Sequence, residues 1–426
     1  MNATPRFRTA EILAVGSELL TPFRSDTNSL FITARLNDCG VDVRAKGVVG
    51  DDPADLRAML AHARSRAQLV VLTGGLGPTE DDVTREVVAE ALGLPLEEDP
   101  ALVEQLERRF ASRGSRMPAI NRRQARVPHG AIALANPRGT APGLWIDQGA
   151  RGVLLLPGPP REMQPMLEGF LRDVLAARTD PRRFHRLVIK IAGWTESGVE
   201  EVAQPVYTRW RDLDPPVQTT ILAAPGQVEL HLTVADADGA RAASRLEAAA
   251  AEVSAVLHPG VFSTNGRSLE EVVGGLLRDR GLTIAVGESC TGGLITSRLT
   301  DVPGSSAYVL ASVVSYGNRA KTELLDVPGE VIEAHGAVSE PVAIAMATGA
   351  RARAHADVGV GVTGIAGPGG ATPGKPVGTV CLAVVPPDGA PRARTRRFPG
   401  ERAVVKQQAS QAALELVRRV LEGEEI

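Results

Sequence analysis

The sequence predicts an α/β protein with two three-layer α/β/α domains of mainly parallel sheets, joined by a small α+β module. Strand-like and helix-like stretches alternate over residues 9–175 and again from Leu269 onward, which is the order that gives parallel sheets covered on both faces. The segment between them changes to strands with one polar face. At 426 residues the chain also exceeds one ordinary domain. We place the domains at residues 1–178, 179–264 and 265–426.

The composition excludes several classes of protein. Lys and Arg total 47 against 50 for Asp and Glu, so the basic excess of a duplex-binding protein is missing and nucleic acid is not an expected partner. Three widely spaced cysteines, without a CxxC pair or a nearby histidine pair, predict neither a disulfide framework nor a zinc site. No apolar run has the length of a membrane span, and the first residues lack a signal-peptide pattern. We therefore expect a cytoplasmic protein without a membrane partner.

The first domain has its polar loops at the carboxyl ends of predicted strands, where ligands bind in open parallel sheets. Strands and helices are predicted in turn at residues 10–16, 26–38, 41–50, 53–66, 68–75 and from Thr79 onward. The loops at the strand ends are Gly16–Glu18, Gly50–Asp52 and Thr73–Asp82.

The third loop, TGGLGPTEDDVT, has two interpretations. Its glycines let backbone N–H groups approach a phosphate, and Asp81 and Asp82 would add carboxylates suited to Mg²⁺. Alternatively, the glycines are turn residues and the two acids belong to the first turn of a helix, where the helix dipole favours them. Two more Gly/Pro loops, NPRGTAPG and LPGPPREM, follow in the same domain. Three such loops at one sheet favour a crevice for a phosphate-bearing ligand.

The middle segment has strands with one polar face and an Ala-rich amphipathic helix over Gly239–Val256. Its candidate core positions are Leu246, Val253 and Leu257. The basic residues at 182–186 either touch nucleic acid or line a solvated strand edge. The strand edge is favoured because no GxxG clamp or aromatic ladder accompanies them.

The third domain repeats the alternation of strand and helix. Helices are predicted at residues 269–280, 294–302, 320–325, 340–355 and 402–421, and strands at 281–286, 308–318, 356–364 and 376–385. The turn GESCTGG, Gly287–Gly293, connects the first strand to a helix. A turn of this kind puts a hydroxyl beside free N–H groups, which can bind an anion or stabilise an oxyanion. Alternatively, Ser289 and Thr291 cap the helix. For the helix at 340–355, Ser339 is the predicted cap.

Four residues lie at or just after the carboxyl ends of predicted strands, namely Ser289, Tyr316, Lys321 and Thr363. This placement makes them neighbours across one crevice. No histidine stands at a comparable strand end, but a partly buried lysine with a lowered pKa can act as the base for a serine, with tyrosine relaying the proton. The loop TGIAGPGG offers N–H groups for a phosphate that Arg402 would clamp. Alternatively, Tyr316 is a core edge and Lys321 a surface charge.

These motifs resemble those of the CinA family along nearly the whole chain. GESCTGG, SYGNRAK, VTGIAGPGG with KPVGTV, and FPGER look like the C-terminal domain of the nicotinamide mononucleotide deamidase type. TGGLGPTEDDVT, NPRGTAPG and LPGPPREM look like the N-terminal domain, which is related to molybdopterin-binding MogA and MoeA domains. The middle module is similar to the KH-like insert of longer family members.

The resemblance implies an amidohydrolase that converts nicotinamide mononucleotide to nicotinate mononucleotide and ammonia without a cofactor, as in pyridine-nucleotide recycling. Ser289 would be the nucleophile, Tyr316 and Lys321 would activate it, and Thr363 would assist. Substrate binding would fall to Cys290, Thr291, Gly292, Gly364, Gly367, Gly369 and Arg402.

In the N-terminal domain the resemblance implies a metal-dependent ADP-ribose pyrophosphatase. A divalent metal such as Mg²⁺, alone or with a monovalent cation, would lie at Asp51 and Asp82. The substrate would be bound by Gly74, Gly75, Gly77 and Asn28. The family usually has a glycine after Glu-Leu-Leu, where this chain has Thr21.

Two functions stay open at this point. One is the nucleotide-recycling enzyme, and the other is a non-catalytic nucleotide- or pterin-binding scaffold linked to competence and the DNA-damage response. Small-molecule nucleotides are the expected partners in both. We also expect a homodimer, because weakly linked domains leave hydrophobic faces to cover.

Overall fold

The computed structural model describes residues 6–424 and divides them into two compact units. The first unit runs to His185 and includes Ala235–Ala240, and the second comprises Arg186–Val234 and the chain from Arg241 onward. The middle segment thus packs with the third predicted domain, and the division 1–178, 179–264 and 265–426 stays a prediction. The outermost limits, at residues 1–5 and 425–426, lie outside the described residues. No helix among residues 6–424 is long and apolar enough to cross a membrane.

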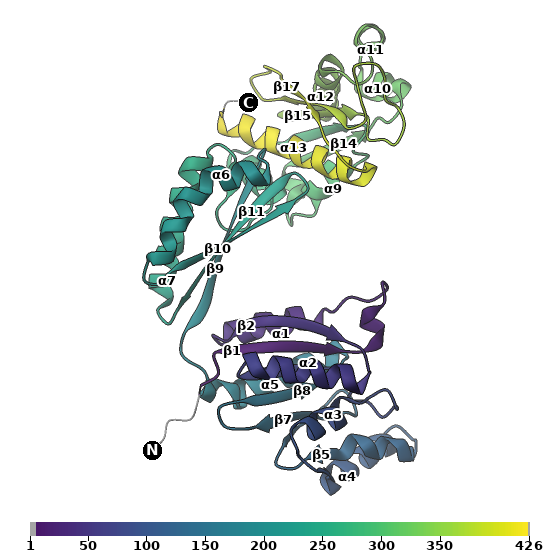
Figure 1. The fold of residues 1–426 in the computed structure, drawn as a ribbon. Coiled ribbons are helices and arrows are strands. Elements are labelled where there is room, and N and C mark those ends of the chain that lie inside the picture. Colours follow the sequence, from purple (N-terminus) through teal and green to yellow (C-terminus); the bar gives the residue numbers. More distant parts are fainter. Residues whose placement is uncertain (1–5, 425–426) are drawn as a thin grey trace. The chain divides into compact units, whose positions relative to one another are not determined.

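The first unit is built on a six-stranded sheet with the order β2-β1-β3-β8-β7-β6 (Figure 1). Its first four strands are parallel, and β7 pairs antiparallel with β8 on one side and with β6 on the other. The strands are β1 (Thr9–Val15), β2 (Asp42–Val49), β3 (Leu69–Thr73), β6 (Ile132–Leu134), β7 (Gly143–Asp147) and β8 (Gly152–Leu156), and a separate pair is β4 (Leu96–Glu98) with β5 (Arg126–Pro128). The prediction of a mainly parallel first sheet is confirmed.

Helices cover both faces of this sheet, as a buried parallel sheet requires. Ile32 of α1 and Phe170 of α5 pack with Ile12 on one face, while Leu56 of α2 packs with Leu13 on the other. The helices are α1 (Asn28–Asp38), α2 (Pro53–Arg66), α3 (Thr84–Ala91), α4 (Pro100–Ala111) and α5 (Pro160–Asp173). The three-layer architecture is confirmed for this domain.

The middle module is a sheet with the order β10-β11-β9-β12 and two helices. Its strands are β9 (Arg183–Ala192), β10 (Val217–Ala224), β11 (Gln227–Asp236) and β12 (Val261–Ser263), and its helices are α6 (Glu196–Tyr207) and α7 (Gly239–Leu257). Buried and partly buried residues alternate along β11, as expected for a strand with one face in the core. The predicted core residues Leu246, Val253 and Leu257 are buried.

The third domain has a five-stranded sheet with the order β14-β13-β15-β16-β17. Strands β14, β13 and β15 are parallel, and β16 and β17 are antiparallel additions at one edge. The strands are β13 (Ile284–Glu288), β14 (Val309–Val314), β15 (Val358–Gly364), β16 (Thr379–Val385) and β17 (Arg392–Arg397). The helices are α8 (Leu269–Asp279), α9 (Leu294–Thr300), α10 (Asn318–Leu325), α11 (Gly329–His335), α12 (Glu340–Ala354) and α13 (Arg402–Glu422).

The structure differs from several predicted element boundaries, and two of these differences and one predicted helix cap have a clear physical reason. Helix α3 begins at Thr84 rather than Thr79, because the Asp82 carboxylate accepts the N–H groups of Gly77 and Thr79 and holds a turn there. Strand β13 begins at Ile284, because the residues before it close the end of α8. The Ser339 hydroxyl donates to the Gly336 carbonyl and does not cap α12.

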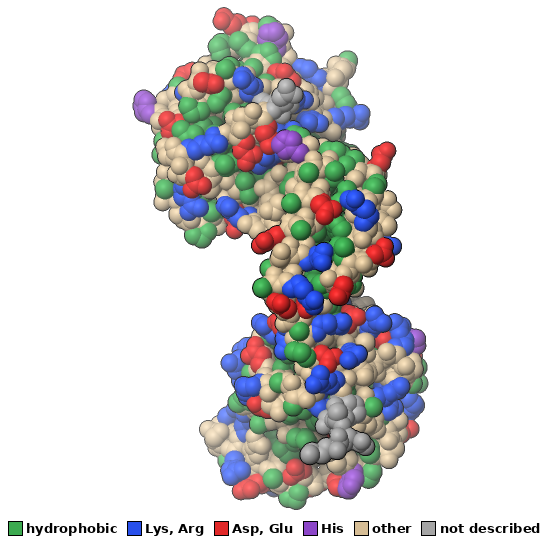
Figure 2. All heavy atoms as spheres, turned by 90° about the vertical axis from the view of Figure 1, so that its left-hand side faces the viewer, with side chains coloured by type: hydrophobic (Ala, Val, Ile, Leu, Met, Phe, Trp, Pro, Cys, Tyr) green, Lys and Arg blue, Asp and Glu red, His purple; other side chains and the backbone are tan. Residues whose placement is uncertain are grey.

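Charged side chains of both signs are interspersed on the molecular face drawn in Figure 2. Lys and Arg together are nearly balanced by Asp and Glu over the chain. Nothing on that face forms the continuous basic stripe that a protein contacting many phosphates presents.

Helix α12 lies directly against β15 at two glycines of the strand, Gly359 and Gly361. A Cβ atom placed on Gly361 would meet the Ala343 carbonyl oxygen at 2.0 Å and the Ala347 nitrogen at 2.7 Å. Both neighbours are backbone atoms of the helix, so they cannot move aside as a side chain would. This close approach sets the depth at which the helix packs on the sheet that carries the candidate site.

We predict that Gly361→Ala lowers the free energy of unfolding by about 1–3 kcal/mol, because the added methyl group overpacks this contact. The measurement is the urea midpoint followed by circular dichroism. Gly329→Ala is the matched control, since a Cβ at that helix position meets nothing within 4 Å. An unchanged midpoint for Gly361→Ala would show that the helix and sheet are less closely packed than described.

Candidate active site

The turn after β13 holds Ser289 between two parallel strands. Its backbone N–H donates to the Val362 carbonyl of β15 at 2.9 Å, and the residue is only 7% exposed. Gly292 and Gly293 have φ angles of 63° and 92°, a left-handed conformation that glycine adopts without strain. The turn therefore reverses direction quickly and leaves Ser289 at the carboxyl end of the sheet.

Glu288 occupies the N-terminus of α9. Its carboxylate, fully buried, accepts the N–H groups of Gly293, Ile295 and Thr296 at 3.0–3.2 Å and the Thr296 hydroxyl at 2.8 Å. The prediction that Ser289 and Thr291 cap this helix is wrong, because no side-chain cap hydrogen bond is present at its N-cap and Glu288 takes the free N–H groups.

Two N–H groups of the turn stay available for an anion. Gly292 N–H donates to the Ser289 carbonyl, whereas the backbone N–H groups of Cys290 and Thr291 donate to no other residue among residues 6–424. The Thr291 hydroxyl is likewise buried without a partner among those residues. An oxyanion formed at Ser289 would find its donors here rather than at the helix N-terminus.

Lys321 is the side chain that meets the serine. Its Nζ atom lies 3.1 Å from the Ser289 Oγ, 3.0 Å from the Ser315 carbonyl oxygen and 3.4 Å from the Tyr316 carbonyl oxygen. The residue is 2% exposed. The alternative that Lys321 is a surface charge is therefore wrong.

The surroundings of Lys321 favour its neutral form. Burial lowers the pKa of its amine below the ordinary value, opposed only by the nearby Cys290. A neutral amine has two N–H bonds and one lone pair. The two carbonyl oxygens can only accept, so they take the N–H bonds and leave the lone pair facing the Ser289 hydroxyl. The arrangement is that of a base and the proton it would remove.

Cys290, next to the serine, is not a competing nucleophile. Burial raises the pKa of its thiol to about 12. Its sulfur also packs against Gly364, where a Cβ atom would lie 3.0 Å from the Sγ. The residue thus forms part of the packed wall of the site, and at neutral pH it carries no thiolate.

Two of the predicted catalytic side chains point elsewhere. The Tyr316 hydroxyl contacts the Arg402 guanidinium, and the Thr363 hydroxyl donates to the Ala337 carbonyl at 2.7 Å. Neither hydroxyl makes a hydrogen bond to Ser289 or Lys321 in the described part of the chain. Tyr316 reaches Lys321 through its backbone carbonyl instead, so a proton relay through its ring stays a prediction.

The predicted phosphate-binding residues lie around the same strand end. Arg402, which begins α13, donates to the Gly367 carbonyl at 2.8 Å and so joins the loop after β15. Gly364 is the last residue of β15, and Gly369 is open on the side where a Cβ would stand. The Arg402 guanidinium thus contacts the loop after β15 through one nitrogen and the Tyr316 hydroxyl through another. Phosphate binding by this group stays a prediction.

The candidate metal residues of the first unit are engaged in hydrogen bonds. The Asp51 carboxylate accepts the Ser17 N–H at 2.8 Å, and the Asp82 carboxylate accepts those of Gly77 and Thr79. Among residues 6–424, no group of three or more His, Cys, Asp or Glu side chains is placed to hold a metal ion. Mg²⁺ is commonly held by one or two carboxylates with substrate phosphates. These two acids fit such an ion only together with a bound phosphate, and the metal stays a prediction.

The glycine loop of the first unit offers fewer N–H groups than predicted. Gly74 donates to the Leu156 carbonyl and Gly77 to Asp82, which leaves Gly75 of the three predicted glycines. Asn28 joins the ends of two strands by donating to the Thr73 hydroxyl and the Gly158 carbonyl. Its own Oδ1 is buried without a partner in the described structure and would accept a hydrogen bond from a ligand.

The fold and the site together define a protein with two α/β domains, one of which carries a buried Ser–Lys pair. Comparisons with known proteins agree with this description. The CinA C-terminal domain matches residues 266–421, and the probable molybdopterin binding domain matches residues 11–177. The chain belongs to the CinA family.

Relatives match along the full chain. A CinA-like protein of Koribacter versatilis is 48% identical over 97% of this chain and 99% of its own length, and a putative competence-damage inducible protein of Symbiobacterium thermophilum is 46% identical over the same shares. A crystal structure of CinA from Thermoplasma acidophilum, described as of unknown function, is 33% identical with a TM-score of 0.37, covering 39% of this chain and 98% of that one.

Two features of the site were missed from the sequence. Glu288 appears there only as one polar residue in a turn, although its position directly after four apolar or small residues was a signal that it ends a buried strand. The contact of the Ser315 carbonyl with Lys321 could not be predicted from the sequence, because every residue carries a backbone carbonyl whatever its side chain.

We predict that Glu288→Gln lowers the free energy of unfolding by about 1–3 kcal/mol. An amide offers one acceptor oxygen, so its NH₂ group would face a donor of α9 that the carboxylate now satisfies. The denaturation midpoint measures this loss, and Glu333→Gln on an exposed helix is the control. Equal midpoints for the two variants would contradict the capping role.

Proposed function

We propose that this chain is an amidohydrolase that converts nicotinamide mononucleotide to nicotinate mononucleotide and ammonia. The observation that carries the proposal is the buried Lys321 amine 3.1 Å from the Ser289 hydroxyl. The choice of substrate rests on the motifs that the third domain shares with the deamidase type of the CinA family.

The first half of the proposed reaction acylates the serine. Lys321 Nζ accepts the hydroxyl proton as Ser289 Oγ attacks the carboxamide carbon. The N–H groups of Cys290 and Thr291 receive the oxyanion that forms. The carbon–nitrogen bond then breaks, and Lys321 returns the proton to the departing ammonia. The nicotinoyl group is left as an ester of Ser289.

The second half releases the acid. A water molecule gives its proton to Lys321 and attacks the ester, and the proton then returns to the Ser289 Oγ as nicotinate mononucleotide leaves. Arg402 and the loop after β15 would hold the substrate phosphate through charge-assisted hydrogen bonds. The same lysine thus acts as base and acid in turn, which requires its pKa to lie closer to neutrality than that of an exposed lysine.

The pyrophosphatase activity implied for the N-terminal domain would use a site of its own, apart from the Ser–Lys pair. The feature there that favours any ligand is the unpartnered Asn28 Oδ1 at the strand ends. We therefore propose for that domain only a phosphate-bearing ligand.

We predict that Ser289→Ala and Lys321→Arg each lower the rate of ammonia release from nicotinamide mononucleotide by at least about 10³-fold. Alanine removes the nucleophile, and a guanidinium keeps its proton and cannot act as the base. Ammonia is measured with the purified full chain at saturating substrate.

Ser305→Ala and Lys190→Arg are the matched controls, since both make the same chemical changes away from the site, and they should keep the full rate. Substantial turnover by Lys321→Arg would remove Lys321 as the base. Binding of the mononucleotide without any ammonia release by the unaltered protein would instead favour the non-catalytic scaffold.

A further inference from the structure

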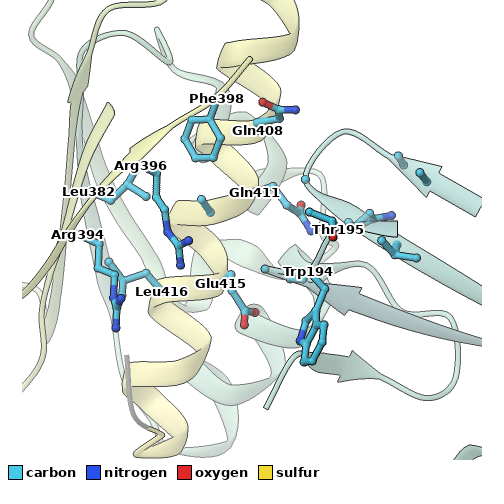
Figure 3. A pocket seen from close by; sticks show the side chains of 18 of the residues that line it. Trp194, Thr195, Leu382, Arg394, Arg396, Phe398, Gln408, Gln411, Glu415 and Leu416 are labelled. Carbon is cyan, nitrogen blue, oxygen red and sulfur yellow. Dashed lines mark hydrogen bonds between the residues drawn. The ribbon is translucent and has the colours of Figure 1, made fainter. Parts of the chain in front are cut away.

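Apart from the candidate active site, the second unit has a cavity between the middle module and α13 (Figure 3). It has a volume of about 440 Å³ and is lined by residues of β9, the β10–β11 hairpin, β17 and α13. None of Ser289, Lys321, Tyr316 or Arg402 lines it. We call it the hairpin cavity.

The floor of the hairpin cavity is apolar. Leu382 of β16 and Leu416 of α13 come from the third domain, and Ala192 and Val228 come from the middle module. Trp194, in the loop after β9, and Phe398, just after β17, add aromatic rings at separate ends of the cavity, and both side chains are only partly buried (Figure 3). An apolar floor with partly open aromatic rings suits a flat ring system.

The wall formed by β17 carries an excess of positive charge. Arg394 and Arg396 are two residues apart, so they share a face of the strand, and Phe398 follows directly after the strand ends. Arg396 extends toward α13 in Figure 3. Neither guanidinium makes a hydrogen bond or an ion pair within residues 6–424, although each lines a largely apolar cavity.

The carboxylates that line the cavity, Glu196 and Glu415, do not balance this charge, because four arginines line it too, namely Arg394, Arg396, Arg397 and Arg419. Glu415 of α13 already accepts from both Arg418 and Arg419, at 2.7–2.9 Å. Its charge is therefore used within the helix. The arginines of β17 are left as a fork suited to a phosphate group, which guanidinium binds in a bidentate manner.

Gln408 supplies a second, independent sign of a ligand. Its Oε1 is buried and has no hydrogen-bond partner in the described structure, and the side chain lies beside Phe398 (Figure 3). A buried acceptor without a donor is costly, so a ligand with an N–H or O–H group would be favoured there. An exocyclic amino group on a ring stacked near Phe398 has that chemistry.

We propose that the hairpin cavity binds a purine nucleotide, with the phosphates at Arg394 and Arg396 and the base on the apolar floor beside Phe398. The volume lies in the range of pockets that hold small molecules of this size. The cavity shares no residue with the Ser–Lys pair, so this inference does not rest on the amidase proposal. It assigns a nucleotide site to this unit that is separate from the Ser–Lys pair.

The test is calorimetric titration of the full chain with ADP. Arg394→Gln/Arg396→Gln should weaken ADP binding about tenfold or more through the loss of charged hydrogen bonds. Arg392→Gln is the matched control, because Arg392 lies on the same strand face outside the cavity, and this variant should bind ADP as the unaltered chain does. Gln408→Leu, which keeps the shape and removes the acceptor, should also bind ADP more weakly.

Adenosine tests the part of the site proposed for the base, and pyrophosphate tests the part proposed for the phosphates. Each should bind more weakly than ADP. Pyrophosphate binding as tight as that of ADP would overturn the proposal that the floor binds the base. ADP binding that is absent, or equally tight in the unaltered chain and the double arginine variant, would overturn the site. Neither result depends on the rate of ammonia release, so this test is independent of the amidase proposal.

Discussion

The third domain depends on a buried lysine amine that no carboxylate of the described residues balances. Lys321 contacts two backbone carbonyls and the Ser289 hydroxyl, and its residue is almost fully enclosed. An ammonium ion there would lose its hydration without gaining an opposite charge. The neutral amine avoids that cost, and a neutral amine is also what a serine nucleophile needs. Structural stability and the proposed chemistry therefore favour the same protonation state.

Glu288 makes this environment possible. It precedes the serine directly, and a carboxylate turned toward Lys321 would hold the amine in its charged form. Four hydrogen bonds to α9 direct the carboxylate to the helix N-terminus instead, where the helix dipole also favours a negative charge. Glycines at the turn and at β15 let the strand ends, the turn and α12 come close enough for this arrangement to be enclosed.

Much of the fold could be predicted, because alternating strands and helices allow few arrangements. The pairing of Ser289 with Lys321 also followed from placing each residue near a strand end, since parallel strands bring those ends to one edge. Other assignments failed where one residue type has several uses. A serine or threonine before a helix has the pattern of a cap, yet Glu288 caps α9. A carboxylate such as Asp82 is suited to a metal in sequence, but here it orders a loop. The contact of Tyr316 with Arg402 joins residues 86 positions apart, which local patterns do not report.

The protonation state of Lys321 is the most direct test of this account. The chain has five lysines, Lys46, Lys190, Lys321, Lys375 and Lys406, so a carbon-13 label at the lysine Cε positions gives a spectrum simple enough to titrate by NMR. Lys321→Arg identifies the resonance by its disappearance. The account predicts that this one resonance titrates at a lower pH than an ordinary lysine, whose pKa is about 10.4. A Lys321 resonance that titrates at the ordinary value would contradict it.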